Sequence, residues 1–243
     1  METKSPASVS IVMPAHNEEG YLDSAVREIT AALNERLSQG VFSRAEVIVV
    51  ENGSADRTAE IGEGLAQEIE IVSTITIDVA NYGAALRAGF LRSTSDIVVN
   101  FDVDYYDIAF LDKATELIAT TDADVVVGSK RTKGAEDTRP WPRRLVTATF
   151  ATVLRLGFGL RVSDTHGMKA MRREPLLPLV HQCLQGTDLF DTELIIRAER
   201  GGRRVVETPV RVEETRPSRS PIAKRVARTL FGLAKLRINI GRP

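Results

Sequence analysis

The first half of this 243-residue chain alternates short apolar runs with amphipathic segments, and this alternation restricts the fold more than any other feature. The apolar runs cover residues 9–13, 47–50, 97–101 and 125–127, and a further strand is expected within residues 69–79. Unbroken β-branched runs of this length are typical of strands that are covered on both faces. The alternation predicts an α/β fold with a doubly wound, mostly parallel sheet.

A polar turn follows each of the first four predicted strands. Asn17 follows the first strand, Asn52 the second, Asn81 the third and Asp102 the fourth. In open α/β sheets, ligands bind beyond the carboxyl ends of the strands. We therefore expect these four turns to converge on one crevice.

Asp102 and Asp104 are the leading candidates for chemistry, because they stand two residues apart at the end of a buried strand. In extended backbone their side chains point to the same side, and two like charges there repel unless a cation lies between them. Carboxylate oxygens suit Mg²⁺ or Mn²⁺, held together with substrate phosphates. A solvated acidic loop is the simpler explanation of an isolated Asp-x-Asp, so the hypothesis depends on the rest of the chain.

Several local expectations follow from turn and helix signals. Ser54 is expected to cap a helix that begins near Ala55. In the second half, a basic, proline-broken segment at residues 139–144 precedes an apolar helix expected at residues 145–158. Residues 162–169 are rich in turn formers, and residues 190–200 predict a helix that ends at a Gly-Gly pair. Residues 205–212 alternate like a strand, in which Pro209 indicates a sheet edge or a bulge.

The last part of the chain, residues 221–243, predicts a basic amphipathic helix. Its apolar face would carry Ile222, Val226, Leu230, Leu233, Leu236 and Ile240, and its basic face Lys224, Arg225, Arg228 and Lys235. Phe231, Arg237 and Ile238 fit neither face. Such a helix suits either an anionic membrane surface or packing against its own domain, and the sequence leaves both open.

Composition excludes several other classes of protein. A net charge of −1 gives no general attraction to nucleic acid. The single cysteine, Cys183, excludes an internal disulfide and favours a reducing compartment. There is no apolar leader and no apolar run of membrane-spanning length, so we expect a cytoplasmic protein, on the cytoplasmic face of the membrane if it meets one, with peripheral contact only. No Gly-x-Gly-x-x-Gly follows the first strand, which argues against a dinucleotide-binding fold.

Six segments occur in a fixed order: Ser-Ile-Val-Met-Pro-Ala-His-Asn-Glu-Glu at 10–19, Val-Val-Glu-Asn-Gly-Ser-Ala-Asp-Arg-Thr at 49–58, Asn-Tyr-Gly-Ala-Ala-Leu-Arg-Ala-Gly at 81–89, Asp-Val-Asp at 102–104, Asp-Thr-His-Gly-Met-Lys at 164–169 and Phe-Asp-Thr-Glu at 190–193. This series resembles the inverting family-2 glycosyltransferases of the GT-A fold, and within them the dolichol-phosphate mannose synthase-like, polyprenyl-phosphate glycosyltransferase group. The resemblance covers about residues 8–222. It implies one GT-A domain over residues 1–220, with a nucleotide-sugar half at about 8–130, an acceptor half at about 131–220 and the tail helix at 221–243.

The resemblance also implies a role for individual residues. The nucleotide pocket would be formed by Pro14, His16, Glu18, Glu51, Asn52 and Asn81, with Arg219 as a further cation for phosphate. The acceptor phosphate would meet Arg131, Arg143 and Thr147, together with Lys169. Asp102 and Asp104 would hold Mg²⁺ or Mn²⁺, and Asp191 would join them as a catalytic residue on the acceptor side.

Two departures from the family pattern leave the donor, GDP-sugar or UDP-sugar, open. Glu51-Asn52 stands where Asp-Asp is usual, and His16 stands where Tyr is common. Two more departures concern the metal sphere and the acceptor site: Asp-Thr-His-Gly from Asp164 is one residue shorter than the usual Asp-Thr-Gln-Cys-Gly, and Tyr106 stands where Gln or another polar residue is common.

Three functions are compatible with this sequence. The favoured one is transfer of a hexose, with inversion, from a nucleotide-sugar to a polyprenyl phosphate, whose oxygen is already anionic and needs positioning by Arg143 rather than a strong base. The second is transfer to a glycan or soluble hydroxyl, for which Asp191 would be the general base. The third is a non-catalytic sugar-nucleotide binder.

Overall fold

The computed structural model describes residues 5–138, 141–184, 189–212 and 222–240, and for residues 142–143 and 222–228 only the backbone course. Arg219 and the predicted boundary at residue 220 lie outside these ranges. A seven-stranded sheet has the order β3-β2-β1-β4-β7-β5-β8. Its strands are β1 (Ser8–Ala15), β2 (Arg44–Asn52), β3 (Val72–Ile77), β4 (Ile97–Asn100), β5 (Val125–Ser129), β7 (Lys169–Arg172) and β8 (Val205–Pro209).

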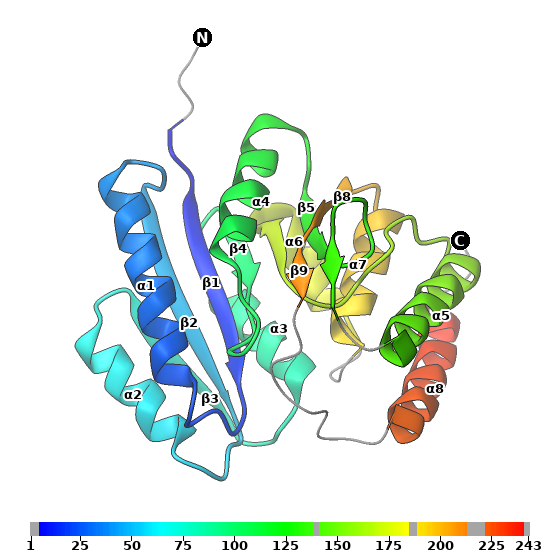
Figure 1. Ribbon diagram of the computed structural model, residues 1–243, viewed down its shortest axis with the longest axis horizontal. Helices are drawn as coiled ribbons and strands as arrows, with labels where there is room; N and C mark the ends of the chain where they lie inside the picture. The colour runs from blue at the N-terminus through cyan, green and yellow to red at the C-terminus, as the bar shows by residue number, and fades with distance from the viewer. Residues whose placement is uncertain (1–4, 139–140, 185–188, 213–221, 241–243) are drawn as a thin grey trace.

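Eight helices surround the sheet in the described residues (Figure 1). They are α1 (Leu22–Ser38), α2 (Thr58–Glu68), α3 (Tyr82–Arg92), α4 (Ile108–Thr120), α5 (Trp141–Phe158), α6 (Arg173–Gln182), α7 (Phe190–Arg200) and α8 (Ile222–Ile240). A separate pair of short strands, β6 (Glu136–Asp137) and β9 (Arg211–Val212), runs parallel beside it. Within the described parts of the chain, no helix combines the length and hydrophobicity that crossing a bilayer requires.

The predicted doubly wound, mostly parallel sheet is confirmed. Strand β1 is parallel to both β2 and β4, and β5 is parallel to β8. Strand β7 is the exception, since it runs antiparallel between β4 and β5. Because β7 begins at Lys169, the antiparallel insertion brings that residue to the same sheet edge at which β4 ends, opposite Asn100.

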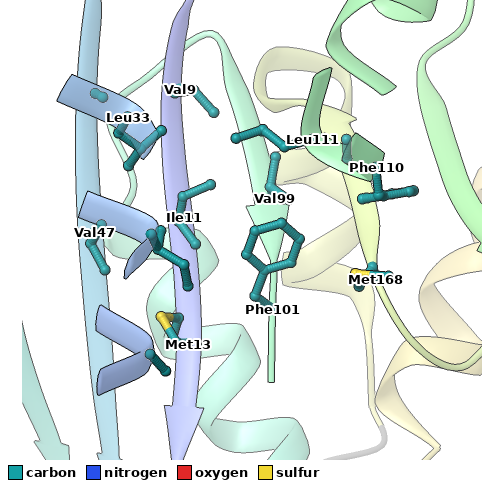
Figure 2. Close-up of a cluster of buried hydrophobic side chains, with 14 of the residues drawn as sticks. Val9, Ile11, Met13, Leu33, Val47, Val99, Phe101, Phe110, Leu111 and Met168 are labelled. Atoms are coloured by element: carbon teal, nitrogen blue, oxygen red, sulfur yellow. The ribbon is translucent and has the colours of Figure 1, made fainter. Parts of the chain in front are cut away.

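Two hydrophobic clusters lie on the two faces of the sheet, as the period of two along a strand requires. Figure 2 shows the first, in which Leu33 of α1 lies at the level of Val9 and Ile11 of β1, Met13 lies further along the same strand, and Phe101 lies at the end of β4. Helices α1, α2 and α4 contribute to this cluster. Val12 points to the opposite cluster, which includes residues of α3 and α5 to α8.

Three local expectations change. The second helix begins at Thr58 rather than near Ala55, and Ser54 does not cap it, because the Ser54 hydroxyl instead accepts a hydrogen bond from the backbone of Asn17. The turn-rich segment runs directly into β7 and α6, neither of which the sequence predicted. The strand expected at 205–212 divides at Pro209, and β8 is the edge strand of the sheet, as this proline indicated.

The tail helix also differs from the predicted division of its faces. Leu233 and Leu236 are buried in the second cluster, so this part of α8 packs on its own domain. Leu230, which the sequence placed beside them, is 50% exposed. Phe231 and Ile238, which fitted neither predicted face, are 76% and 81% exposed.

Close contact between α3 and the sheet predicts that Gly89 tolerates no side chain. A Cβ at this position would lie 2.3 Å from Val12 Cγ1 and 3.1 Å from Val50 Cγ2. Gly89→Ala should therefore lower the free energy of unfolding by about 1–3 kcal/mol in a urea titration, through overpacking. Gly64→Ala is the matched control, because a Cβ there meets nothing within 4 Å and alanine favours a helix by about 1 kcal/mol. Equal stability of the two variants would contradict the close packing.

Candidate active site

Hydrogen bonds join the turns that follow β1, β2 and β3 at their carboxyl ends. His16 Nδ1 donates to the backbone oxygen of Asn52 at 2.8 Å, and Asn52 Oδ1 accepts from the backbone nitrogen of Asn81 at 2.6 Å. Asn17 Oδ1 accepts from the backbone of Ala55 at 2.8 Å. The backbone of Asn17 has a φ of 56°, a left-handed conformation that asparagine adopts more readily than most residues. The turns after the first three strands therefore lie together, as predicted.

The other residues predicted for the nucleotide pocket lie in the same region. Pro14 is buried near the end of β1, and the carboxylate of Glu51 accepts a hydrogen bond from the backbone of Ser54 at 2.6 Å. Glu18 begins the approach to α1, where its backbone nitrogen donates to the hydroxyl of Thr58 at 2.7 Å. Asn81 caps α3 by accepting from the backbone of Ala84. These contacts fix the turns, and the side chains of Glu51 and Asn81 take part in them directly.

The Asp102 carboxylate is connected to this network through Tyr82, the first residue of α3. The Tyr82 hydroxyl donates to Asp102 Oδ1 at 2.8 Å, and the backbones of Asp102 and Tyr105 bond to each other in a tight turn. This turn places Asp104, which is exposed, close to Asp102. Tyr82 had no role assigned from the sequence, although it directly follows Asn81 in the segment that resembles the family.

The pKa of Asp102 is raised to about 6. Burial is the largest cause, and the charges of Asp191 and Asp104 raise it further, while the hydrogen bond from Tyr82 and the charge of Lys169 oppose the rise. The same surroundings raise the pKa of Tyr82 well above its usual value. Burial is the largest cause of both shifts, and the negative charge gathered at this edge of the sheet adds to each of them.

Asp191 and Lys169 form an ion pair next to these carboxylates. Lys169 Nζ lies 2.9 Å from Asp191 Oδ2, and the two side chains are 0% and 2% exposed. Lys169 also donates to the backbone oxygen of Gly167 at 2.7 Å, whereas Asp191 Oδ1 is buried and has no hydrogen-bond partner among the described residues. Lys169, which the sequence suggested for the acceptor phosphate, is thus occupied by a protein carboxylate. Glu193 lies two residues after Asp191 in the same motif. Its carboxylate pairs with Arg197 and accepts a hydrogen bond from the backbone of Leu184.

The other residues predicted for the acceptor lie on and before α5. Arg131 is exposed after β5, where its backbone donates to Ser129 Oγ. Thr147 is half-buried within the second turn of α5. Arg143 is in the first turn of this helix, and its side chain lies outside the described part of the structure.

The loop before β7 has contacts that the sequence did not predict. Glu207 Oε1 accepts from the backbone and hydroxyl of Ser163 and from the backbone of Asp164, which ties the loop to β8. Asp164 Oδ2 lies 3.4 Å from Lys130 Nζ. Burial lowers the pKa of His166, whose ring meets Phe150 of α5 edge-on at 5.2 Å. The loop therefore links β5, β8 and α5 around the Asp191 side of the site.

The carboxylates at this edge fit a divalent cation. Among the described residues, no three His, Cys, Asp or Glu side chains gather into a complete metal site. Asp102 and Asp104 match instead the kind of Mg²⁺ or Mn²⁺ site that substrate phosphates and water complete. The raised pKa of Asp102 agrees with this, since a bound cation would offset both the burial of its charge and the repulsion from Asp191 and Asp104.

An open α/β sheet with paired carboxylates at a strand end agrees with a GT-A fold. The sequence signature of Glycosyl transferase family 2 matches residues 10–178. The chain therefore belongs to glycosyltransferase family 2, and the prediction of a glycosyltransferase is confirmed.

Relatives agree with this assignment. A dolichyl-phosphate hexose transferase of Haloferax volcanii is 34% identical over 208 residues, which cover 85% of this chain and 83% of that protein. Glycosyltransferase AglD of the same organism is 31% identical over 211 residues, but these cover 86% of this chain and only 33% of AglD. A dolichyl-phosphate β-glucosyltransferase of Trichomonas vaginalis is 29% identical over 228 residues, covering 90% of this chain and 70% of that one.

Solved structures confirm the GT-A fold. Glucosyl-3-phosphoglycerate synthase from Mycobacterium tuberculosis, in complex with phosphoglyceric acid, superimposes with a TM-score of 0.68 at 21% identity. The match covers 98% of this chain and 81% of that one. The same enzyme in complex with Mn²⁺, UDP and glucosyl-3-phosphoglycerate has a TM-score of 0.64 at 22% identity, with the same coverage of both chains.

The buried ion pair predicts a large and specific effect on stability. Lys169→Met should lower the free energy of unfolding by about 3–5 kcal/mol, because it leaves the charge of Asp191 buried without its partner. Adding Asp191→Asn to the same protein should restore part of this loss, since the orphaned charge is then removed. Urea titrations measure both effects.

Lys113→Met is the control for this comparison. Lys113 pairs with Glu116 at the surface, where such pairs contribute about 0–1 kcal/mol. A double variant no more stable than Lys169→Met would show that the loss comes from packing rather than from charge.

Proposed function

We propose that this enzyme transfers a hexose from a GDP- or UDP-sugar to a polyprenyl phosphate, with divalent metal at Asp102 and Asp104. The observation that carries the proposal is the gathering of Asp102, Asp104 and Asp191 at the edge where the turns after β1 to β3 also meet. The high coverage of a relative named as a dolichyl-phosphate hexose transferase supports the lipid acceptor.

On the donor side, the chain's own residues position the nucleotide and accept negative charge beside it. The joined turns at His16, Asn52 and Asn81 form the floor on which the nucleoside would lie. Tyr82 orients the carboxylate of Asp102, which would hold the metal with Asp104. When bound, a divalent cation supplies the positive charge that stabilises the departing diphosphate.

On the acceptor side, the phosphate oxygen of the lipid attacks the anomeric carbon from the face opposite the diphosphate. This nucleophile is already anionic near neutral pH, since the second pKa of a phosphate ester is about 6. It needs orientation by cations, and Arg143 offers two parallel donors for that purpose. The product is a glycosyl lipid phosphate with inverted configuration at the anomeric carbon.

Asp191 has a different task in this scheme. Its ion pair with Lys169 holds the carboxylate in place beneath the acceptor side. A fixed negative charge there would stabilise positive charge that develops on the sugar ring, and would keep the lipid phosphate from moving past the anomeric carbon.

The metal site is tested by calorimetric titration of GDP and of UDP, each with and without Mn²⁺. One nucleotide should bind more tightly in the presence of Mn²⁺, and Asp104→Ala should weaken that binding at least about tenfold, the loss typical even of an outer partner of a metal site. Glu116→Gln, which removes a surface carboxylate on α4, should change nothing. Binding of neither nucleotide to the wild type would overturn the metal–diphosphate assignment of Asp102 and Asp104.

The acceptor is tested by steady-state kinetics with a short-chain, water-soluble prenyl phosphate and with the corresponding alcohol. Arg143→Ala should lower kcat/KM for the phosphate roughly tenfold to a hundredfold, since a hydrogen bond to a charged group contributes about 1.5–3 kcal/mol. Arg144→Ala is the matched control, because this neighbouring arginine is exposed and points to another side of the same helix turn.

The two acceptor hypotheses differ in which variant loses activity. A hydroxyl acceptor, with Asp191 as its general base, would be supported by a different pattern. The wild type would then transfer sugar to the alcohol, Asp191→Asn would abolish this transfer and Arg143→Ala would leave it unchanged.

A further inference from the structure

Helices α5 and α8 lie side by side at one end of the molecule (Figure 1). The guanidinium of Arg237 on α8 stands 5.8 Å from the centre of the Phe158 ring at the end of α5. Leu154 and Phe158 of α5 share a buried cluster with Leu233 and Leu236 of α8. The inner faces of both helices therefore pack into this buried cluster, and each helix has an outer face directed to solvent.

The outer face of α8 is apolar, although it faces solvent. Phe231 and Ile238 are seven residues apart, which places them on one side of a helix, and they are 76% and 81% exposed. At 100° per residue, this side is opposite the one that carries the buried Leu233 and Leu236. Lys235 is exposed beside the two apolar side chains.

The outer face of α5 has the same character. Trp141, Leu145 and Leu156 occur at helical spacing, and they are 73%, 57% and 82% exposed. Arg144 and Arg155 are exposed next to this apolar stripe. Exposed large apolar side chains that gather on adjacent elements mark an interaction site rather than ordinary surface.

Charge identifies the partner. The whole chain has 32 Lys and Arg against 33 Asp and Glu, whereas α5 and α8 together have eight Lys and Arg and no acidic residue. A surface that combines apolar side chains with unopposed positive charge matches the interface of a bilayer that contains anionic lipid. A protein partner that buried the same apolar side chains would not require this exclusion of acidic residues from both helices.

We propose that the outer faces of α5 and α8 form a docking surface for an anionic lipid bilayer. Phe231, Ile238, Trp141, Leu145 and Leu156 enter the headgroup region, and the basic side chains beside them meet lipid phosphates. The inference extends the proposed function, because α5 also carries Arg143 and Thr147. Docking through this helix holds the acceptor side of the active site at the depth where the phosphate of a polyprenyl lipid lies.

The test is vesicle flotation with the full chain, using phosphatidylcholine alone and phosphatidylcholine with added anionic phosphatidylglycerol. Wild type should bind the anionic vesicles, and added salt should weaken the binding. Phe231→Ser with Ile238→Ser should reduce the vesicle–water partition coefficient at least about tenfold, because two large apolar side chains are then no longer transferred from water into the bilayer on binding. Lys235→Gln should weaken binding to anionic vesicles and leave the weaker binding to neutral ones unchanged.

Val41→Ser is the control for the apolar substitutions, since Val41 is 47% exposed after α1 and belongs to neither helix. Equal binding of Phe231→Ser/Ile238→Ser and Val41→Ser would overturn the docking surface. Sedimentation velocity addresses the other occupant of such a surface: a wild-type dimer that Phe231→Ser/Ile238→Ser dissociates, without vesicle binding, would assign this surface to self-association and likewise overturn the proposal.

Kinetics separate this proposal from the proposed function. Phe231→Ser/Ile238→Ser should keep wild-type activity on a short-chain prenyl phosphate in solution and lose it on a long-chain acceptor embedded in anionic vesicles. If the wild type binds vesicles but transfers sugar to neither acceptor, the docking surface is supported and the polyprenyl-phosphate acceptor is contradicted. Transfer to the short-chain acceptor without vesicle binding would do the reverse.

Discussion

The concentration of negative charge at one edge of the sheet is the constraint around which this molecule is arranged. Burial raises the pKa of Asp102, and the charges of Asp191 and Asp104 raise it further, while the ammonium of Lys169 is paired with Asp191. Such an arrangement costs stability in the absence of a cation, because desolvation of a carboxylate is unfavourable. A cation bound at this edge, as proposed above, would offset that cost.

The unusual strand of the sheet brings a cation to this edge. Strand β7 interrupts the parallel order between β4 and β5 and runs in the opposite direction. Its first residue, Lys169, thereby reaches the carboxyl edge of β4, whereas in a parallel strand the first residue would lie at the far edge. The loop that leads into β7 is fixed at its other side by three hydrogen bonds to a single oxygen of Glu207. The reversal thus delivers a cation to Asp191 and holds the acceptor-side loop in place.

The sequence predicted those parts of the site that depend on one strand and the turn after it. Asn17, Asn52, Asn81 and Asp102 each follow an apolar run, and the geometry of a parallel sheet then brings them together. It could not predict the Lys169–Asp191 pair, because this pair depends on the direction of β7, and a four-residue strand after a turn-rich segment has no distinctive period. The sequence also indicated the wrong role for Ser54. Its hydroxyl can either cap a helix or bond a neighbouring turn, and only the tertiary structure decides that it bonds the turn at Asn17.

The tail helix shows that an apolar sequence pattern alone can assign a helix face wrongly. Hydrophobicity alone grouped Leu230 with Leu233 and Leu236, and left Phe231 and Ile238 unexplained. A helix with apolar side chains on two opposite sides can pack against two apolar neighbours, and the domain is one of them, through Leu233 and Leu236. The absence of acidic residues from α8 and from the adjacent α5 indicates the nature of the other. The two interpretations of the tail that the sequence left open, packing on the domain and contact with a membrane, are therefore compatible, because they concern different faces of one helix.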